Sequence, residues 1–335
     1  MFSRKLKMAN FTSTYDRVSD DVAYLCDTNV PTITGPFFIL IFILSIICNG
    51  LLLCVLFIYE NLKNITNIFI LNLVCSDLIF TTTLRFWAVD YLDHWVFEDF
   101  VCKFVTAAFF VGLYSSVILL TAMTVDRFIA VVLDKLKINH AKKKKYAICS
   151  CIAAWVISIS ASLSDAMKVK TESWDGFNYC YDESEDKLGR YLQVSLLFFL
   201  PFAIIIFCYS AILKTVLQGL NRKKFRTVAV LLCIVAVFFI CWGPYHIMLL
   251  IKSLNTNKDC NVLKQLAVAY HISEMLAYSH CCMNPLLYML SQKLRKHLLN
   301  LLCCENVGRK KRERSTSLNT SVTQNVAFSV QSSAV

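Results

Sequence analysis

Charged residues are scarce in this sequence. Asp, Glu, Lys and Arg make up 17% of its 335 residues, whereas 57% are hydrophobic. That balance is too apolar for an ordinary soluble domain of this length, so we expect a membrane protein. The opening segment MFSRKLKMANFTSTYDRVSDD also lacks the apolar stretch that a removable signal peptide needs. The first hydrophobic span should therefore direct its own insertion.

Several patterns that would indicate other classes of protein are missing. We find no internal repeat of the kind that marks inverted-repeat transporters, which weighs against a transporter or channel. No spacing of cysteine, histidine or acidic residues suggests a metal site. No grouping of nucleophile, base and oxyanion donors indicates an enzyme. We therefore expect no catalysis and no cofactor, apart from the sodium ion considered below.

Long hydrophobic runs dominate what remains. Runs of roughly 20 residues, the length that crosses a bilayer as a helix, lie at 36–58, 66–89, 102–126, 146–167, 191–216, 227–251 and 263–290. The sequence thus predicts an all-α membrane protein, with a seven-transmembrane helix bundle over residues 36–290. An odd number of spans places the two ends of the chain on opposite sides of the membrane.

The distribution of basic residues indicates which segments face the cytoplasm and which face the outside. Lys and Arg gather in 134–145 (DKLKINHAKKKK), in 214–226 (KTVLQGLNRKKFR) and after residue 291. Because cytoplasmic loops carry an excess of Lys and Arg, these segments should face the cytoplasm and residues 1–35 should form an extracellular tail. We therefore expect a multi-pass plasma-membrane protein with its amino terminus outside. Topology then accounts for most of the net charge of +11, and nucleic acid is not indicated.

The segment after the last span has an amphipathic pattern. In SQKLRKHLLNLLCC, residues 291–304, leucines lie on one helical face and basic residues on the other: Leu294, Leu298 and Leu301 against Lys293, Arg295 and Lys296. This pattern predicts a short helix on the membrane surface, in contact with lipid. Cys303 and Cys304 at its end are candidate palmitoylation sites, with unmodified thiols as the alternative. Residues 305–335 are polar and rich in Ser and Thr, so we expect a disordered cytoplasmic tail.

Cysteines and acids mark the outer face. Four of the 16 cysteines lie outside in this topology: Cys26, Cys102, Cys180 and Cys260. In an oxidising compartment they can form two disulfides, in any of three connectivities.

The extracellular tail has a glycosylation sequon at Asn10 and becomes acidic after residue 15. Tyr15, Asp16 and Tyr24 lie in a setting suited to tyrosine sulfation. Such a surface would attract a basic ligand, while a merely solvated acidic segment is the alternative.

Asp77 lies in the middle of the second predicted span, where an unpaired carboxylate is costly and indicates a functional site. We expect Asn49, Ser116 and Asn284 to be its partners. Their oxygen atoms suit a hard cation such as Na⁺, and a water-filled polar network is the alternative.

Each predicted span carries a landmark, in a specific order. These are Asn49, Asp77, Asp126-Arg127-Phe128, Trp155, Pro201, CWGP at 241–244 and NPLLY at 284–288. The ordered set resembles the rhodopsin-like G-protein-coupled receptors over residues 30–304. In those receptors an intramembrane acid such as Asp77 implies an inhibitory sodium site.

A narrower resemblance is to the chemokine receptors. It rests on SHCCMNPLLY (279–288), on Glu274 three turns above Pro285, on Trp87 and Trp95, and on the four outer cysteines. Within that family, YENLKNITNIFILNLVCSDLIF and LYSSVILLTAMT are most similar to the XC type, the lymphotactin receptors. The chain departs from the family pattern at Arg85, where proline is usual, at Glu98 in WVFE, and at Phe128 after Asp-Arg.

The resemblance implies a ligand site that opens outward. A basic chemokine would enter a pocket lined by Trp87, Phe109, Tyr114, Tyr245, His271, Glu274 and Tyr278, with Glu274 as the buried anion. Arg85 would be a partner of Glu274, a ligand contact or a residue that extends toward the membrane surface. The implied disulfides join Cys102 to Cys180 and Cys26 to Cys260.

The resemblance also implies a signalling end. Residue 127 lies 25 residues inward from Cys102, or about 37 Å along a helix, at the inner membrane edge. Asp126 would hold Arg127 at rest, and activation would release it toward a heterotrimeric G protein, with Tyr209 and Tyr288 moving in behind. Pro244 should kink its helix beside Trp242. Asn284 and Pro285 are the remaining residues that the resemblance assigns to G-protein coupling and activation. Phosphorylation of the tail would recruit arrestin. A scavenging receptor and a receptor for another peptide are the alternatives.

Overall fold

The computed structural model of the chain describes residues 30–133, 139–174, 176–182, 187–218, 222–255, 259–288 and 292–302. Several sequence predictions fall outside these residues: Asn10, Tyr15, Asp16, Tyr24, Cys26, Cys303, Cys304, the tail 305–335 and the side chain of Tyr288.

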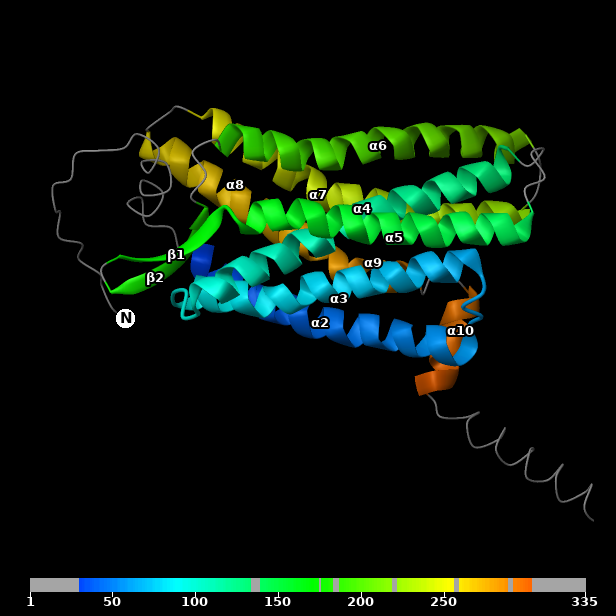
Figure 1. Cartoon of the computed structure of the whole chain (residues 1–335), viewed down its shortest axis with the longest axis horizontal. Helices are drawn as coiled ribbons and strands as arrows, with labels where there is room; N and C mark the ends of the chain where they lie inside the picture. Colours follow the sequence, from blue (N-terminus) through cyan, green and yellow to red (C-terminus); the bar gives the residue numbers. More distant parts are fainter. Residues whose placement is uncertain are drawn as a thin grey trace, which may run out of the picture.

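Long helices make up most of the described chain, and they pack side by side (Figure 1). They are α2 (Val30–Tyr59), α3 (Ile65–Leu92), α4 (Asp99–Val131), α5 (His140–Ala166), α6 (Lys187–Gln218) and α7 (Arg222–Leu254). Each of these six contains a stretch long and apolar enough to cross a membrane. Asn64 and Asn139 begin α3 and α5, where each side-chain oxygen accepts a backbone N–H of the first turn.

The seventh span is divided, although the sequence predicted one uninterrupted run. It consists of α8 (Cys260–Tyr278) and α9 (His280–Tyr288), which are separated at Ser279. Pro285 lacks the N–H that would bond to the carbonyl of Cys281 in a regular helix. That carbonyl instead accepts hydrogen bonds from Asn49 Nδ2 (2.9 Å) and Ser45 Oγ (3.3 Å). The break therefore ties the last span to α2.

The outer faces of these helices are apolar. Side chains such as Leu200, Phe207 and Val156 are about 60% exposed, whereas Phe80 and Trp242 in the interior are fully buried. A folded chain in water rarely leaves so many large apolar side chains on its surface. The described helices therefore form a seven-transmembrane bundle whose outer surface suits lipid.

A β-hairpin covers one end of the bundle (Figure 1). Strands β1 (Val169–Trp174) and β2 (Phe177–Asp182) are antiparallel, and Gly176 has the positive φ of 82° that their tight turn requires. The Cys102–Cys180 disulfide, with Cα atoms 5.7 Å apart, joins β2 to α4. The Thr171 N–H also donates to Asp99 Oδ1 (2.8 Å). The sequence did not predict this hairpin.

The opposite end carries α10 (Gln292–Leu302), which crosses the end of α2 (Figure 1). Its predicted amphipathic character is confirmed where side chains are described: Arg295 and Lys296 are exposed, while Leu298 and Leu301 are partly buried. The His297 ring stacks on Tyr59, with ring centroids 4.9 Å apart, and its Nε2 lies 3.7 Å from Glu60 Oε1. These contacts hold the surface helix against the bundle.

Candidate functional site

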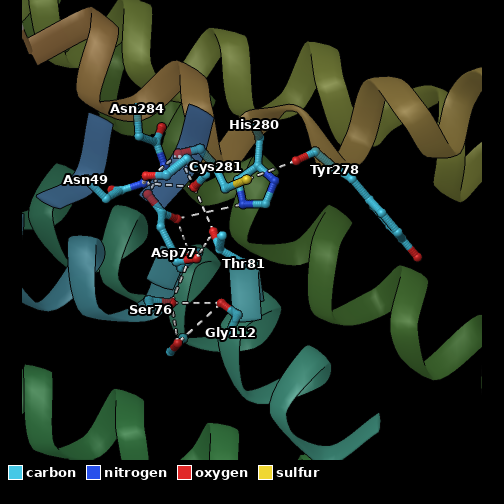
Figure 2. A network of polar contacts seen from close by, with 12 residues as sticks. Asn49, Ser76, Asp77, Thr81, Gly112, Tyr278, His280, Cys281 and Asn284 are labelled. Atoms are coloured by element: carbon cyan, nitrogen blue, oxygen red, sulfur yellow. Dashed lines mark hydrogen bonds and ion pairs between the residues drawn. The ribbon is translucent and has the colours of Figure 1, made fainter. Parts of the chain in front are cut away.

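A network of polar side chains crosses the bundle interior around Asp77 (Figure 2). The Asp77 carboxylate is fully buried. It accepts hydrogen bonds from Asn284 Nδ2 on α9 (2.9 Å) and from Ser116 Oγ on α4 (3.3 Å). The structure thus brings together Asp77 and two of its three expected partners, from helices far apart in the sequence.

Asn49, the third expected partner, joins the same network indirectly. Its amide donates to Ser45 and to the Cys281 carbonyl. The Ser45 hydroxyl contacts Thr81 Oγ1 (2.7 Å), and Thr81 donates to the Asp77 carbonyl (2.6 Å). Ser45 and Thr81 carry no distinctive sequence signal, so only the packing of α2 against α3 reveals their part.

Oxygen atoms in this network fit a small hard cation. Within the described residues, Asn49 Oδ1 and Asn284 Oδ1 are buried and have no hydrogen-bond partner. Buried acceptors in this condition call for a donor, a water molecule or a cation. Together with the Asp77 carboxylate and Ser116 Oγ they supply the all-oxygen ligands that Na⁺ favours.

His280 is a member of the network that sequence reasoning missed. Its Nδ1 lies 2.8 Å from the Ala277 carbonyl, and its Nε2 lies 3.8 Å from Asp77 Oδ1. The residue was visible within SHCC, but its proximity to an acid on another helix was not. The break at Ser279 turns this side chain toward α3.

Trp242 separates the network from the outer half of the bundle. It is fully buried. Its ring centroid lies 5.3 Å from that of His280 on one side and 6.1 Å from that of Tyr278 on the other. The helix α7 continues through Pro244, two residues further on. Trp242 therefore contacts both the network, through His280, and Tyr278, which lines a cavity on the β-hairpin side of the bundle.

A cavity of about 260 Å³ lies on the β-hairpin side of the bundle, where Val169, Cys180 and Tyr181 contribute to its lining. Five predicted ligand residues line it: Trp87, Phe109, Tyr245, Glu274 and Tyr278. Lining residues that the sequence did not indicate include Asp90, Tyr91, Thr106 and Tyr270. They come from α3, α4 and α8, and their inward orientation depends on helix rotation, which the hydrophobic pattern of these spans does not reveal.

Glu274 is surrounded by donors at one side of this cavity. It is 5% exposed. Tyr91 OH donates to its Oε2 (2.7 Å), Tyr278 OH donates to its Oε1 (3.2 Å), and His271 Nδ1 lies 3.3 Å from Oε2. The buried carboxylate thus has partners from both α3 and α8.

Three other predicted ligand residues do not line the cavity. His271 reaches it through its contacts with Glu274 and Tyr91, which do line it. Tyr114 donates to the buried carboxylate of Asp165 (2.8 Å), which links α4 to α5. Arg85 is exposed, and its guanidinium lies over the ring of Phe86, 4.7 Å from the centroid, rather than beside Glu274.

At the opposite end of α4, Asp126 and Arg127 form an ion pair. Arg127 donates to Asp126 Oδ2 through Nη2 (2.5 Å) and Nε (3.1 Å), and both side chains are about one-fifth exposed. Tyr209 on α6 is buried. The landmark Trp155 donates to Asn72 Oδ1 (2.9 Å) and so fastens α5 to α3.

The outer cysteines are oxidised where the structure describes them. The Cys102–Cys180 disulfide is present as predicted. Cys260 is also disulfide-bonded, while its predicted partner Cys26 lies outside the described residues.

Sequence comparison agrees with this architecture. Residues 48–288 match the family model of the 7 transmembrane receptor (rhodopsin family). The match spans more than half of the chain and covers the cavity and all of the polar network except Ser45. The chain therefore belongs to the rhodopsin-like family of seven-transmembrane receptors, which are not enzymes.

Individual relatives indicate which branch of the rhodopsin-like family the chain belongs to. The chain is 38% identical to chemokine XC receptor 1 of Mus musculus over 301 residues, which cover 88% of this chain and 91% of that receptor. It is 38% identical to chemokine XC receptor 1 of Homo sapiens over 80% of this chain and 81% of that receptor. It is 32% identical to human C-C chemokine receptor type 1 over 79% and 78% respectively. Within the rhodopsin-like family, the chain is a member of the chemokine receptor family.

Proposed function

We propose that this chain is a cell-surface receptor that binds a basic chemokine from outside and activates a heterotrimeric G protein inside. The observation that carries the proposal is the course of α4. One helix carries Thr106 and Phe109 at the cavity and the Asp126–Arg127 pair at its other end. Seventeen residues separate Phe109 from Asp126, or about 26 Å along the helix axis. A movement at the cavity can thereby reach the pair.

We propose an XC-type, lymphotactin-like chemokine as the ligand. Support comes from the two XC receptor relatives, which are more similar to this chain than the C-C receptor quoted above. The acidic tail with Tyr15, Asp16 and Tyr24 would collect a basic protein electrostatically. A glycan at Asn10 and a Cys26–Cys260 disulfide would complete this outer face.

Signalling would follow from release of Arg127. An inhibitory G protein, chemotaxis and calcium mobilisation are the outputs that the family suggests. In the inactive state Na⁺ would be held by Asp77, Ser116, Asn284 and Asn49, whose oxygen atoms fit it. Its charge would stabilise the buried carboxylate. Arrestin would bind the phosphorylated tail, and palmitoyl groups on Cys303 and Cys304 would anchor α10.

A screen of basic chemokines on cells that express the chain tests this proposal. The readouts are surface binding and GTPγS loading of membranes, with XC chemokines expected to give both. Binding without loading would favour a scavenging receptor. A response to a non-chemokine peptide alone would favour a receptor for another peptide. Sodium flux in proteoliposomes would favour a transporter.

The Arg127→Ala variant provides a matched control for the screen. It should bind the same chemokine at the surface but fail to load GTPγS, because the residue lies far from the cavity. Equal loading by this variant would contradict the assigned role of the pair.

A further inference from the structure

Arg85 is a charged residue on the outer surface of a membrane-spanning helix. It lies in α3, seven residues before that helix ends at Leu92, or about 10 Å along the helix axis. Its side chain is exposed, although the surface of the bundle around it is largely apolar. A charge in such a position is costly in hydrocarbon and indicates a function, because it calls for an anion close by.

Arg85 has no anionic partner within the described part of the chain. Its guanidinium lies over the ring of Phe86, 4.7 Å from the centroid, and it forms no hydrogen bond or ion pair with a described acid. Glu274, the partner that the sequence suggested, accepts from Tyr91 and Tyr278 instead. The five N–H donors of the guanidinium are therefore open to a group from outside the chain.

The acids that follow Arg85 in the chain face other groups. Asp90 lines the cavity inside the bundle. Asp93 and Asp99 each lie beside a basic side chain, at 3.1 Å and 2.5 Å respectively. Glu98 is exposed at the start of α4 and is not bonded to Arg85. The anion that Arg85 calls for is therefore not supplied by this loop.

An aromatic cluster holds the ring beneath the guanidinium in place. Phe86 packs on Phe97, with ring centroids 5.0 Å apart, and Phe97 packs on Trp95 at 5.1 Å. Trp95 is fully buried in the same cluster as Cys102, whose disulfide joins α4 to the β-hairpin. Because the cation–π contact with a fixed ring already orients the guanidinium, little side-chain freedom remains to be lost when an anion binds.

The helix face next to Arg85 suits an acyl chain. At intervals of three and four residues toward the middle of α3 it carries Thr82, which is exposed, and Leu78 and Cys75, which are partly exposed. The Thr82 hydroxyl donates to the carbonyl of Ile79 (2.7 Å), so its hydrogen is used within the helix. Arg85 thus lies at the end of a mostly apolar strip that runs toward the centre of the membrane.

We propose that Arg85 is the headgroup site for one phospholipid of the leaflet on the β-hairpin side of the membrane. The guanidinium donates two parallel hydrogen bonds to the lipid phosphate, which its planar fork matches. A long side chain this close to the helix end reaches the phosphate layer. Phe86 positions the guanidinium, and one acyl chain lies along Thr82, Leu78 and Cys75. The inference requires neither a chemokine nor a G protein.

Competition between two photoreactive lipids tests the site in the full-length receptor. Receptor in dodecyl maltoside, a detergent without phosphate, receives equal amounts of a phosphatidylcholine probe and a galactosyl diacylglycerol probe. Each probe carries a diazirine near the glycerol end of one acyl chain. After illumination, mass spectrometry measures the phospholipid-to-galactolipid labelling ratio on the α3 peptide that contains Thr82. The same ratio on the α6 peptide that contains the lipid-exposed Phe207 is the internal reference.

The unmodified receptor should favour the phosphatidylcholine probe on α3. Arg85→Gln should lower the referenced ratio roughly fivefold, because a charge-assisted bidentate contact is lost. Arg85→Lys keeps the charge but not the planar fork, so it should give an intermediate ratio. Arg85→Leu repeats the loss if the glutamine variant folds poorly, because leucine suits a lipid-facing position.

Lys103→Gln is the matched control. Lys103 is a cation at the same end of the bundle, but its Nζ lies 2.5 Å from Asp99 Oδ2. Because its charge already has a partner, its removal should leave the ratio nearly unchanged.

Three results would overturn the lipid site. Equal ratios in the unmodified and Arg85→Gln receptors would mean that Arg85 does not recognise the lipid phosphate. A loss of the same size in Lys103→Gln would assign the preference to net charge. Displacement of the phosphatidylcholine probe by inorganic phosphate at the same concentration would assign the site to the free ion. A failed chemokine screen would overturn the proposed function but leave this site standing, since no chemokine enters the measurement.

Discussion

At the scale of single residues, the buried charges are the features that packing alone does not explain. Asp77 and Asp165 are both fully buried. Asp77 shares its network with Asn49 and Asn284, whose Oδ1 atoms have no hydrogen-bond partner within the described residues, whereas the unbonded Oδ1 of Asp165 faces the ammonium group of Lys168. Asp165 accepts from Tyr114 and lies 4.0 Å from Lys168, as expected of a structural acid. The two acids therefore offer a matched comparison.

We predict that sodium stabilises the purified receptor through Asp77. Replacing KCl with NaCl at constant ionic strength should raise the Tm by a few degrees, because a cation that binds only the folded state adds stability by mass action. Asp77→Asn should abolish the difference, whereas Asp165→Asn should keep it even if its Tm is lower overall. A sodium response that survives Asp77→Asn would remove the proposed ion from this site.

We predict that the Asp126 carboxylate restrains Arg127. The contact is charge-assisted and partly shielded from water, so its loss should shift the resting equilibrium toward the signalling state. Asp126→Asn should raise GTPγS loading in the absence of chemokine several-fold relative to the unmodified receptor at equal surface expression. The Asp126→Asn/Arg127→Ala double variant is the control, and it should show no increase.

At the scale of secondary structure elements, close helix contacts explain where small residues are needed. A Cβ atom placed on Gly112 would lie 2.7 Å from Cβ and 2.9 Å from the backbone of Phe80. Phe80 is fully buried and its backbone cannot rotate away. The α3–α4 contact therefore requires glycine at this position.

We predict that Gly112→Ala destabilises the receptor by about 1–3 kcal/mol, as overpacking of a filled core does. Gly50→Ala is the control: it lies in α2 and a Cβ there would meet nothing within 4 Å. That substitution should be neutral or slightly stabilising, since alanine favours helix over glycine. Thermal unfolding in detergent distinguishes them, and equal Tm values would mean that α3 and α4 separate more easily than the structure indicates.

At the scale of the whole molecule, the bundle has two chemically distinct ends. The β-hairpin, the disulfide-bonded cysteines and the cavity share one end, while Asp126–Arg127 and α10 share the other. Because extracellular cysteines are oxidised and cytoplasmic segments are rich in Lys and Arg, we expect the first end to face the outside and the second end to face the cytoplasm.

We predict that an epitope tag at the amino terminus is stained on intact cells, whereas a carboxyl-terminal tag needs permeabilisation. The physical reason is the excess of Lys and Arg in residues 134–145, in residues 214–226 and after residue 291. Staining of the carboxyl-terminal tag alone on intact cells would reverse the polarity and with it the proposed direction of signalling.

Properties that depend on composition along the chain were accessible from the sequence. The apolar runs predicted the spans to within a few residues for α3, and the ordered landmarks identified the family. Leucine and lysine spacing predicted the amphipathic α10. These features follow from local physics, since hydrophobic length decides membrane insertion and residue spacing decides which face of a helix is apolar.

Only the tertiary structure decided which side chains meet. It placed Asn284 beside Asp77 across 207 positions of sequence, divided the last span so that His280 lies near that acid, and set Asp90 in the cavity with Arg85 outside it. Such contacts depend on how far each helix is rotated about its axis and on the backbone groups that Pro285 leaves free. Rotation is determined by packing against neighbouring helices, and the nearly uniform apolarity of a membrane span does not encode it.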